Sequence, residues 1–88
     1  MNIATFFGNV LSEKTGLKVV PCAGLIRLSI KKAGKTPENI SFPELKSIFQ
    51  KELKEKLEGV GLDNVQGIIK HMITELIKNQ SLFTMSAR

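Results

Sequence analysis

The chain has 88 residues, of which 42% are apolar and 24% charged, and its 13 Lys and Arg against 8 Asp and Glu give a net charge of +5. This length is typical of one domain with one modest core, and the composition excludes global disorder. No apolar run approaches the roughly 18 residues of a membrane span, and the N-terminus lacks the basic and apolar regions of a signal peptide. We therefore expect a single domain over residues 1–88, in the cytoplasm and without membrane contact.

Helical periodicity begins directly at the N-terminus. Apolar residues recur at i, i+3, i+4, i+7 and i+8 from Ile3, which predicts a helix to about Lys14 with Asn2 as N-cap and Gly16 as its stop. The next four residues, 17–20, alternate and contain two β-branched valines, which predicts a short extended segment. Pro21 suits the first position of a second helix, which should run to about Ala33 before Gly34.

The third helix has the clearest start signal in the chain. Ser41 and Glu44 have the spacing of a capping box, in which each side chain accepts a hydrogen bond from the other residue's backbone amide. Ile40 and Leu45 occupy the staple positions on either side of it. We expect this helix to end at about Glu58, before Gly59. Its outer face carries three i,i+4 pairs of opposite charge, Lys51/Glu55, Glu52/Lys56 and Lys54/Glu58, which are typical of a solvated surface.

A fourth helix is predicted over about Asn64–Asn79, with Asp63 as N-cap and the most regular apolar stripe of the chain. The last residues lose helical spacing yet include Leu82, Phe83 and Met85. Such an apolar tail must be covered by its own domain or by a partner chain. The predicted fold class is all-α: a compact four-helix domain with at most one or two short extended segments, about 17–20 and 81–86.

Basic residues are concentrated in the first half of the chain, where residues 14–35 contain six Lys and Arg and no acidic residue. Such a cluster can bind an acidic protein surface, a phosphate or a nucleic-acid backbone. Alternatively, cations at the end of the second helix simply complement its dipole. The candidate anion-binding or partner-binding residues are Lys18, Arg27, Lys31, Lys32 and Lys35.

Catalytic and metal-binding patterns are absent from the sequence. Cys22 is the only cysteine and His71 the only histidine, and neither has a sequence-adjacent partner for general acid–base or nucleophilic chemistry. Cys22 is either a small buried apolar residue or a thiol activated in the first turn of the second helix. We expect no enzyme activity, no cofactor and no metal.

A nucleic-acid-binding function is the main alternative. The third helix, a short turn, the fourth helix and an apolar tail are similar in order to a helix-turn-helix followed by one wing strand. However, the fourth helix, which would enter the groove, offers no Arg, and the chain has no Trp or Tyr for base stacking.

The function that the sequence favours is a non-catalytic protein-interaction module that associates with itself, with a dimer favoured, or with another protein. Leu28 and Ile48 lie off the main apolar stripes of their helices, and the tail is apolar. The candidate self-association residues are Leu28, Ile48, Leu82, Phe83 and Met85. A shared apolar patch in space would favour a protein partner, whereas a continuous basic groove would favour the basic nucleic-acid-binding alternative, winged-helix-like or helical.

Overall fold

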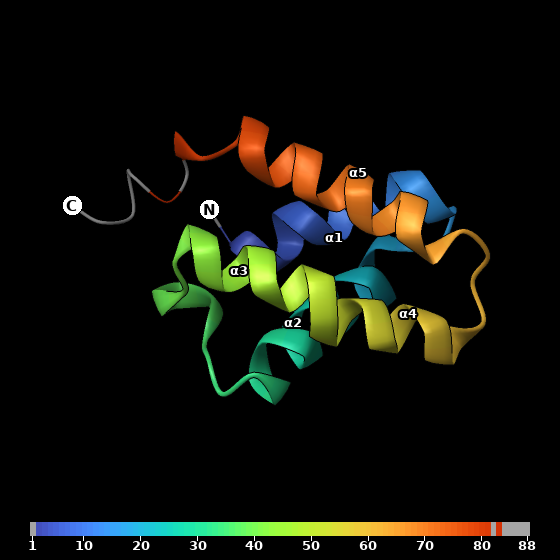
Figure 1. Ribbon diagram of the computed structural model, residues 1–88, viewed down its shortest axis with the longest axis horizontal. Helices are drawn as coiled ribbons and strands as arrows, with labels where there is room; N and C mark the ends of the chain where they lie inside the picture. The colour runs from blue at the N-terminus through green and yellow to red at the C-terminus, as the bar shows by residue number, and fades with distance from the viewer. Residues whose placement is uncertain (1, 82, 84–88) are drawn as a thin grey trace.

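The computed structural model describes residues 2–81 and 83, and over these residues the protein is all-α. Four long helical segments are joined by short connections (Figure 1). The elements in chain order are α1 (Ile3–Thr15), α2 (Val19–Lys32), the 3₁₀ turn η1 (Pro37–Asn39), α3 (Phe42–Ile48), the π-helical turn η2 (Phe49–Leu53), α4 (Lys54–Val60) and α5 (Val65–Lys78). The elements α3, η2 and α4 continue without a break and are called the long helix below.

The first helix begins and ends as the sequence predicts. The Asn2 side chain accepts hydrogen bonds from the amides of Ala4 and Thr5, and Gly16 ends the helix in the left-handed conformation at φ 81°. The predicted extended segment at 17–20 is wrong, because α2 already begins at Val19. Pro21 fits in the third position of that first turn, where a backbone amide has no partner within the helix.

Helices α1 and α2 pack unusually close together at Gly8. A Cβ atom on Gly8 would lie 2.7 Å from the Cα atom of Ala23, which is closer than such atoms approach in proteins. Because Gly8 has only a hydrogen atom in place of a side chain, the backbones of α1 and α2 can come into close contact here.

The capping box that starts the long helix is confirmed. The Ser41 amide donates to the Glu44 carboxylate at 2.9 Å, and the Glu44 amide donates to the Ser41 hydroxyl at 3.3 Å. The helix ends later than predicted: Gly59 lies within α4, and Gly61 ends it at φ 87°.

The π turn in the long helix follows from the spacing of its buried residues. Leu45, Phe49, Leu53 and Leu57 are each four residues apart, and all four are fully buried. An ideal α-helix rotates about 100° per residue, so three four-residue steps would carry Leu57 roughly 120° away from Leu45. The wider π turn at Phe49–Leu53 rotates less per residue and returns these side chains to one face.

Ile48 is a correction to the predicted surface. It is only 3% exposed and belongs to the core, not to a face left free for a partner. The middle of the long helix packs against α2 on one side and α5 on the other. The two neighbouring helices therefore bury more than one narrow face of this helix, and Ile48 is buried although it lies beside the main apolar stripe.

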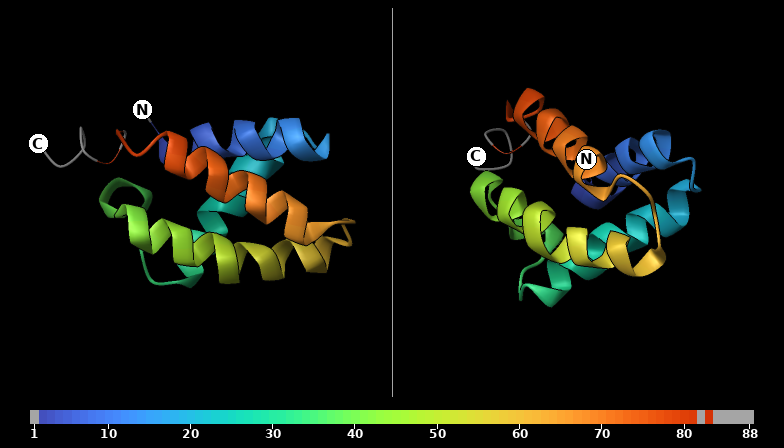
Figure 2. Two further views of the ribbon diagram at one scale, coloured as in Figure 1. Left: turned by 45° about the horizontal axis from the view of Figure 1, so that its top comes forward. Right: turned by 45° about the vertical axis from the view of Figure 1, so that its right-hand side comes forward.

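Helix α5 lies beside both α1 and the long helix (Figure 2). Its N-cap is Asn64, at φ 56°, and not Asp63 as the sequence suggested. Asn tolerates this left-handed conformation better than most residues. A Cβ atom on Gly67 would collide with the Asn64 side chain, so the glycine leaves room for that side chain over the first turn.

The part of the tail that the structure describes packs on its own chain. Phe83 is half-buried, and its ring meets Phe42 edge-on with 6.0 Å between ring centroids. Ser81 and Phe83 are helical, so the expected extended segment at 81–86 is not found at these two positions. Leu82 and Met85 lie outside the described residues.

The core is centred on an aromatic contact between the first helix and the π turn. Phe7 and Phe49 are both fully buried, and their rings meet edge-on with 5.3 Å between centroids. Met72 and Leu76 of α5 are also fully buried, which agrees with the predicted place of that helix in the core.

The close approach at Gly8 predicts that Gly8→Ala destabilises the protein, although Ala is the better helix former. Overpacking against the Ala23 backbone should lower the free energy of unfolding by about 1–3 kcal/mol. Gly59→Ala is the matched control, since nothing lies within 4 Å of a Cβ atom at that helical position. It should raise stability by about 0.5–1 kcal/mol. Equal urea midpoints for the two variants would contradict the predicted packing.

Candidate functional site

Helix α2 presents an apolar stripe to solvent. Val20 is 82% exposed and Leu28 is 53% exposed, and Gly24 lies between them with open space around its Cβ position. The three are four residues apart and thus lie on one side of the helix. Together with the neighbouring Arg27 and Lys31 we call this surface the α2 outer face.

The sequence identified Leu28 in this stripe but missed Val20 and Gly24. The four-residue spacing is visible in the sequence only if the helix begins before Val20. The predicted extended segment at 17–20 removed Val20 from the pattern.

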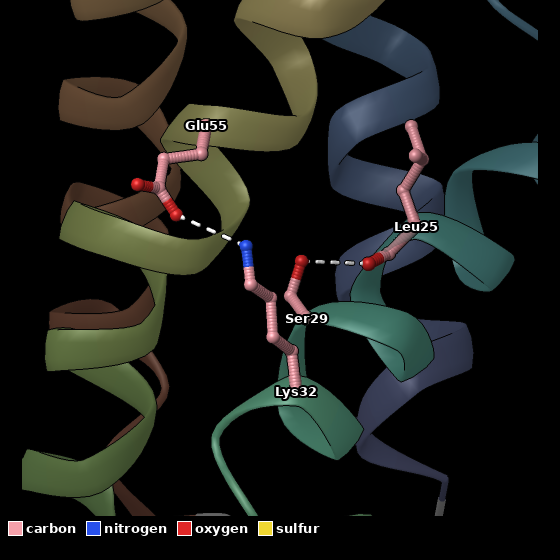
Figure 3. A network of polar contacts seen from close by, with 4 residues as sticks. All are labelled: Leu25, Ser29, Lys32 and Glu55. Atoms are coloured by element: carbon pink, nitrogen blue, oxygen red, sulfur yellow. Dashed lines mark hydrogen bonds and ion pairs between the residues drawn. The ribbon is translucent and has the colours of Figure 1, made fainter.

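Two of the predicted basic-cluster residues are paired within the chain. Lys32 Nζ lies 3.3 Å from Glu55 Oε1, across the contact between α2 and α4 (Figure 3). Lys35 Nζ lies 2.8 Å from Glu44 Oε2, at the start of α3. The pairs link the end of α2 and the connection after it to the long helix, and both lie at the surface.

Ser29 is a buried polar residue of α2 that lies close to the Lys32–Glu55 pair. Its side chain is buried, and its hydroxyl donates to the Leu25 carbonyl at 2.8 Å (Figure 3). This buried hydroxyl is therefore satisfied within its own helix.

The three expected i,i+4 ion pairs of the long helix do not form among the residues described. The pairs Lys51/Glu55 and Glu52/Lys56 span the π turn, where four-residue neighbours no longer lie directly above one another. Glu55 instead reaches across to Lys32. The interhelical partner replaces the local one because α2 packs directly against η2.

The remaining candidate cations are exposed. Lys18, Arg27 and Lys31 form no ion pair with any residue that the structure describes. Arg27 and Lys31 are one turn apart on the α2 outer face, beside the apolar stripe. The predicted cluster thus divides into two lysines that are paired with carboxylates of the long helix and three cations without such a partner among the described residues.

A second surface lies between the long helix and α5, and sequence reasoning did not identify it. It is a groove of about 370 Å³, which we call the α4–α5 groove. Its lining residues are Gln50, Lys54, Gln66, Ile69, Lys70, Ile73 and Thr74. The two isoleucines form an apolar floor, and the polar and cationic residues form the rims.

Cys22 has the properties of a buried structural thiol. It is fully buried in the core, and this burial raises the pKa of the Cys22 thiol above its usual value, with the Thr15 side chain only partly offsetting the effect. No three His, Cys, Asp or Glu side chains gather at a possible metal site within residues 2–81 and 83.

No helix in the described part of the chain is long and apolar enough to cross a bilayer. Comparison with protein-family models, with curated proteins and with solved structures found no match to this chain.

The Lys35–Glu44 pair predicts a specific loss of stability in acid. The hydrogen bond from Lys35, together with those from Ser41, lowers the pKa of Glu44 to about 2. Because the carboxyl is more acidic in the folded state than in the unfolded state, its contribution is full above about pH 5 and is lost as the pH falls toward about 2.

Glu44→Gln tests this contribution because Gln keeps the capping acceptor but loses the charge. The variant should lose less stability than the parent between about pH 6 and about pH 3, measured as urea midpoints. Identical pH dependence in the two proteins would show that the carboxylate makes no such contribution.

The burial of Cys22 predicts slow thiol chemistry. A disulfide reagent such as dithiobis(nitrobenzoate) should react with the native protein far more slowly than with the protein in urea, because the thiolate is both disfavoured and shielded. Equally fast reaction in both states would identify an accessible, activated thiol.

Proposed function

We propose that this chain is a non-catalytic protein-interaction module that self-associates through the α2 outer face. The observation that carries the proposal is the exposure of Val20 and Leu28 on one side of a helix, with Gly24 between them. Covering such side chains is favourable, by about 25 cal/mol for each Å² removed from water.

This face is complementary to itself. In an antiparallel pair of α2 helices related by a two-fold axis at Gly24, a residue four positions after the glycine meets one four positions before it. Leu28 of each copy then packs on Val20 of the other. The absence of a side chain at Gly24 lets the two backbones approach closely at the axis.

The same arrangement keeps like charges apart. Arg27 follows Gly24 by three residues, so the two copies of Arg27 are offset by six residues, or about 9 Å along the helix. The two copies of Lys31 are offset by about 21 Å, which exceeds the Debye length of about 8 Å at physiological salt. Arg27 and Lys31 therefore border the contact, and neither lies directly opposite its own copy.

The predicted dimer is weak. Helix α2 has 14 residues and is thus about 21 Å long, so its exposed face covers less than the about 1,200–2,000 Å² buried in stable complexes. Ile48 and Phe83 do not enlarge the contact, because both pack within their own chain. We expect association only at high micromolar concentration.

Nucleic-acid binding has less support than self-association. Glu55 and Glu44 lie beside Lys32 and Lys35, so acidic groups interrupt the basic cluster. The exposed cations border an apolar stripe on α2, whereas a phosphate backbone is bound by a continuous basic surface.

Leu28→Lys tests the self-association. Sedimentation equilibrium of the parent at high micromolar concentration should give a mass above that of one chain, and the variant should give the monomer mass at unchanged helicity. Val60→Lys is the matched control, because Val60 is 52% exposed on a different helix, and it should associate like the parent. A monomeric parent, or equal masses for parent and Leu28→Lys, would contradict the proposal.

A further inference from the structure

We infer that the α4–α5 groove binds an acidic amphipathic helix of a partner protein. The groove lies on different elements from the α2 outer face, so this inference does not depend on self-association. Figure 1 shows α5 running alongside the long helix, and the groove follows the line between them.

The apolar part of the groove extends along α5. Its floor is formed by Ile69, which is 7% exposed, and by half-buried Ile73, and Ile77, one turn beyond Ile73 and outside the lining, is 49% exposed. These residues are spaced by four, so they form a strip along the helix. A partner that covers this strip must itself present apolar side chains in a row, as one face of an amphipathic helix does.

Positive charge borders this strip on both sides. Lys54 lines the groove from α4 and Lys70 lines it from α5, and no acidic residue is among the lining residues. Neither lysine forms an ion pair with the part of the chain that the structure describes. Charge complementarity therefore calls for carboxylates on both flanks of the partner's apolar face.

The shape of the groove favours a helix over a small molecule. Gln50, Gln66, Lys70 and Thr74 are all exposed, so the groove is an open trough between two helices. Small-molecule sites bury about 70–90% of their ligand, which a trough walled by two helices does not do. A third helix fits between two helices by packing its ridge of side chains into their groove.

The lining also fits a nucleic acid poorly. Two lysines are few for a phosphate backbone, and none of the seven lining residues is aromatic, so no stacking platform is present. A nucleic-acid strand in the groove would also place its charged phosphates against the two isoleucines of the floor, which gains nothing from their apolar surface.

A designed peptide tests the inference. A labelled peptide of about 16 residues, or four turns, would carry Leu at i, i+3, i+4 and i+7 with Glu on both flanks. A matched peptide would have Lys in place of each Glu. Fluorescence anisotropy should show that the Glu peptide binds more tightly than the Lys peptide, and amide NMR shifts on binding should concentrate at Ile69, Ile73 and Thr74.

Lysine variants identify the binding surface. The double variant Lys54→Gln, Lys70→Gln should bind the Glu peptide about 2- to 25-fold more weakly, as expected for two exposed charge pairs. The control double variant Lys31→Gln, Lys51→Gln makes the same change of charge outside the groove and should bind like the parent. At low micromolar concentration, where the parent is monomeric, Leu28→Lys should also bind like the parent, which separates this test from that of self-association.

Several results would overturn the inference. Equal binding of the Glu and Lys peptides would show that charge does not select the partner. If both double variants lost the same affinity for the Glu peptide, binding would depend on the net charge of the protein and not on the groove. If a single-stranded oligonucleotide or vesicles with about 30% anionic lipid bind in a way that depends on Lys54 and Lys70 while the Glu peptide does not, the groove has a different occupant from the one inferred.

Discussion

Four buried residues at four-residue intervals set the constraint on which this structure depends. An α-helix cannot keep such a series on one face, because each step adds about 40° of rotation. The π turn at Phe49–Leu53 removes the accumulated rotation and lets Leu45 and Leu57 point into the same core. Phe49, inside that turn, meets Phe7 of α1. The common buried face of the long helix and its aromatic contact with α1 thus both involve this one local irregularity.

The charged residues of the long helix differ in whether they have a partner within the chain. Its acidic residues Glu44 and Glu55 meet lysines from the end of α2 and its following connection, whereas Lys54 faces α5 across the groove. Two of its carboxylates are therefore paired within the chain, whereas its lysine at the groove has no such partner among the described residues. A net charge of +5 says nothing about this asymmetry, because the separation arises only when the helices pack.

Sequence reasoning worked where the determining interactions are local. The Asn2 cap, the Gly16 stop and the Ser41–Glu44 capping box each depend on a few neighbouring residues, and all three are present. The start of α2 was misplaced because β-branched residues before Pro21 fit a strand or a first helical turn equally well in sequence. That error concealed the stripe that now carries the proposed dimer.

Features that depend on distant residues were not predictable. The four-residue spacing indicates the π turn only once all four residues are known to be buried on one face, and that burial depends on α2 and α5, which pack against η2. The partner of Glu55 lies on another helix, so the i,i+4 spacing in the sequence predicted Lys51 as its partner, whereas the structure pairs it with Lys32. The groove has residues from two helices that are 12 to 24 positions apart in the sequence, and no single amphipathic pattern contains it.

The two proposed surfaces are coupled by charge. Self-association brings together two copies that each carry a net charge of +5, which opposes a dimer with a small contact. An acidic helix bound in the groove lowers the net charge of each copy, and the repulsion between the copies falls with it. Because coupling between two binding equilibria is reciprocal, whatever the acidic partner adds to dimer stability, dimerisation adds to the affinity for that partner. The excess of basic residues thus weakens the association of the chain when it is alone, and a bound acidic partner favours assembly.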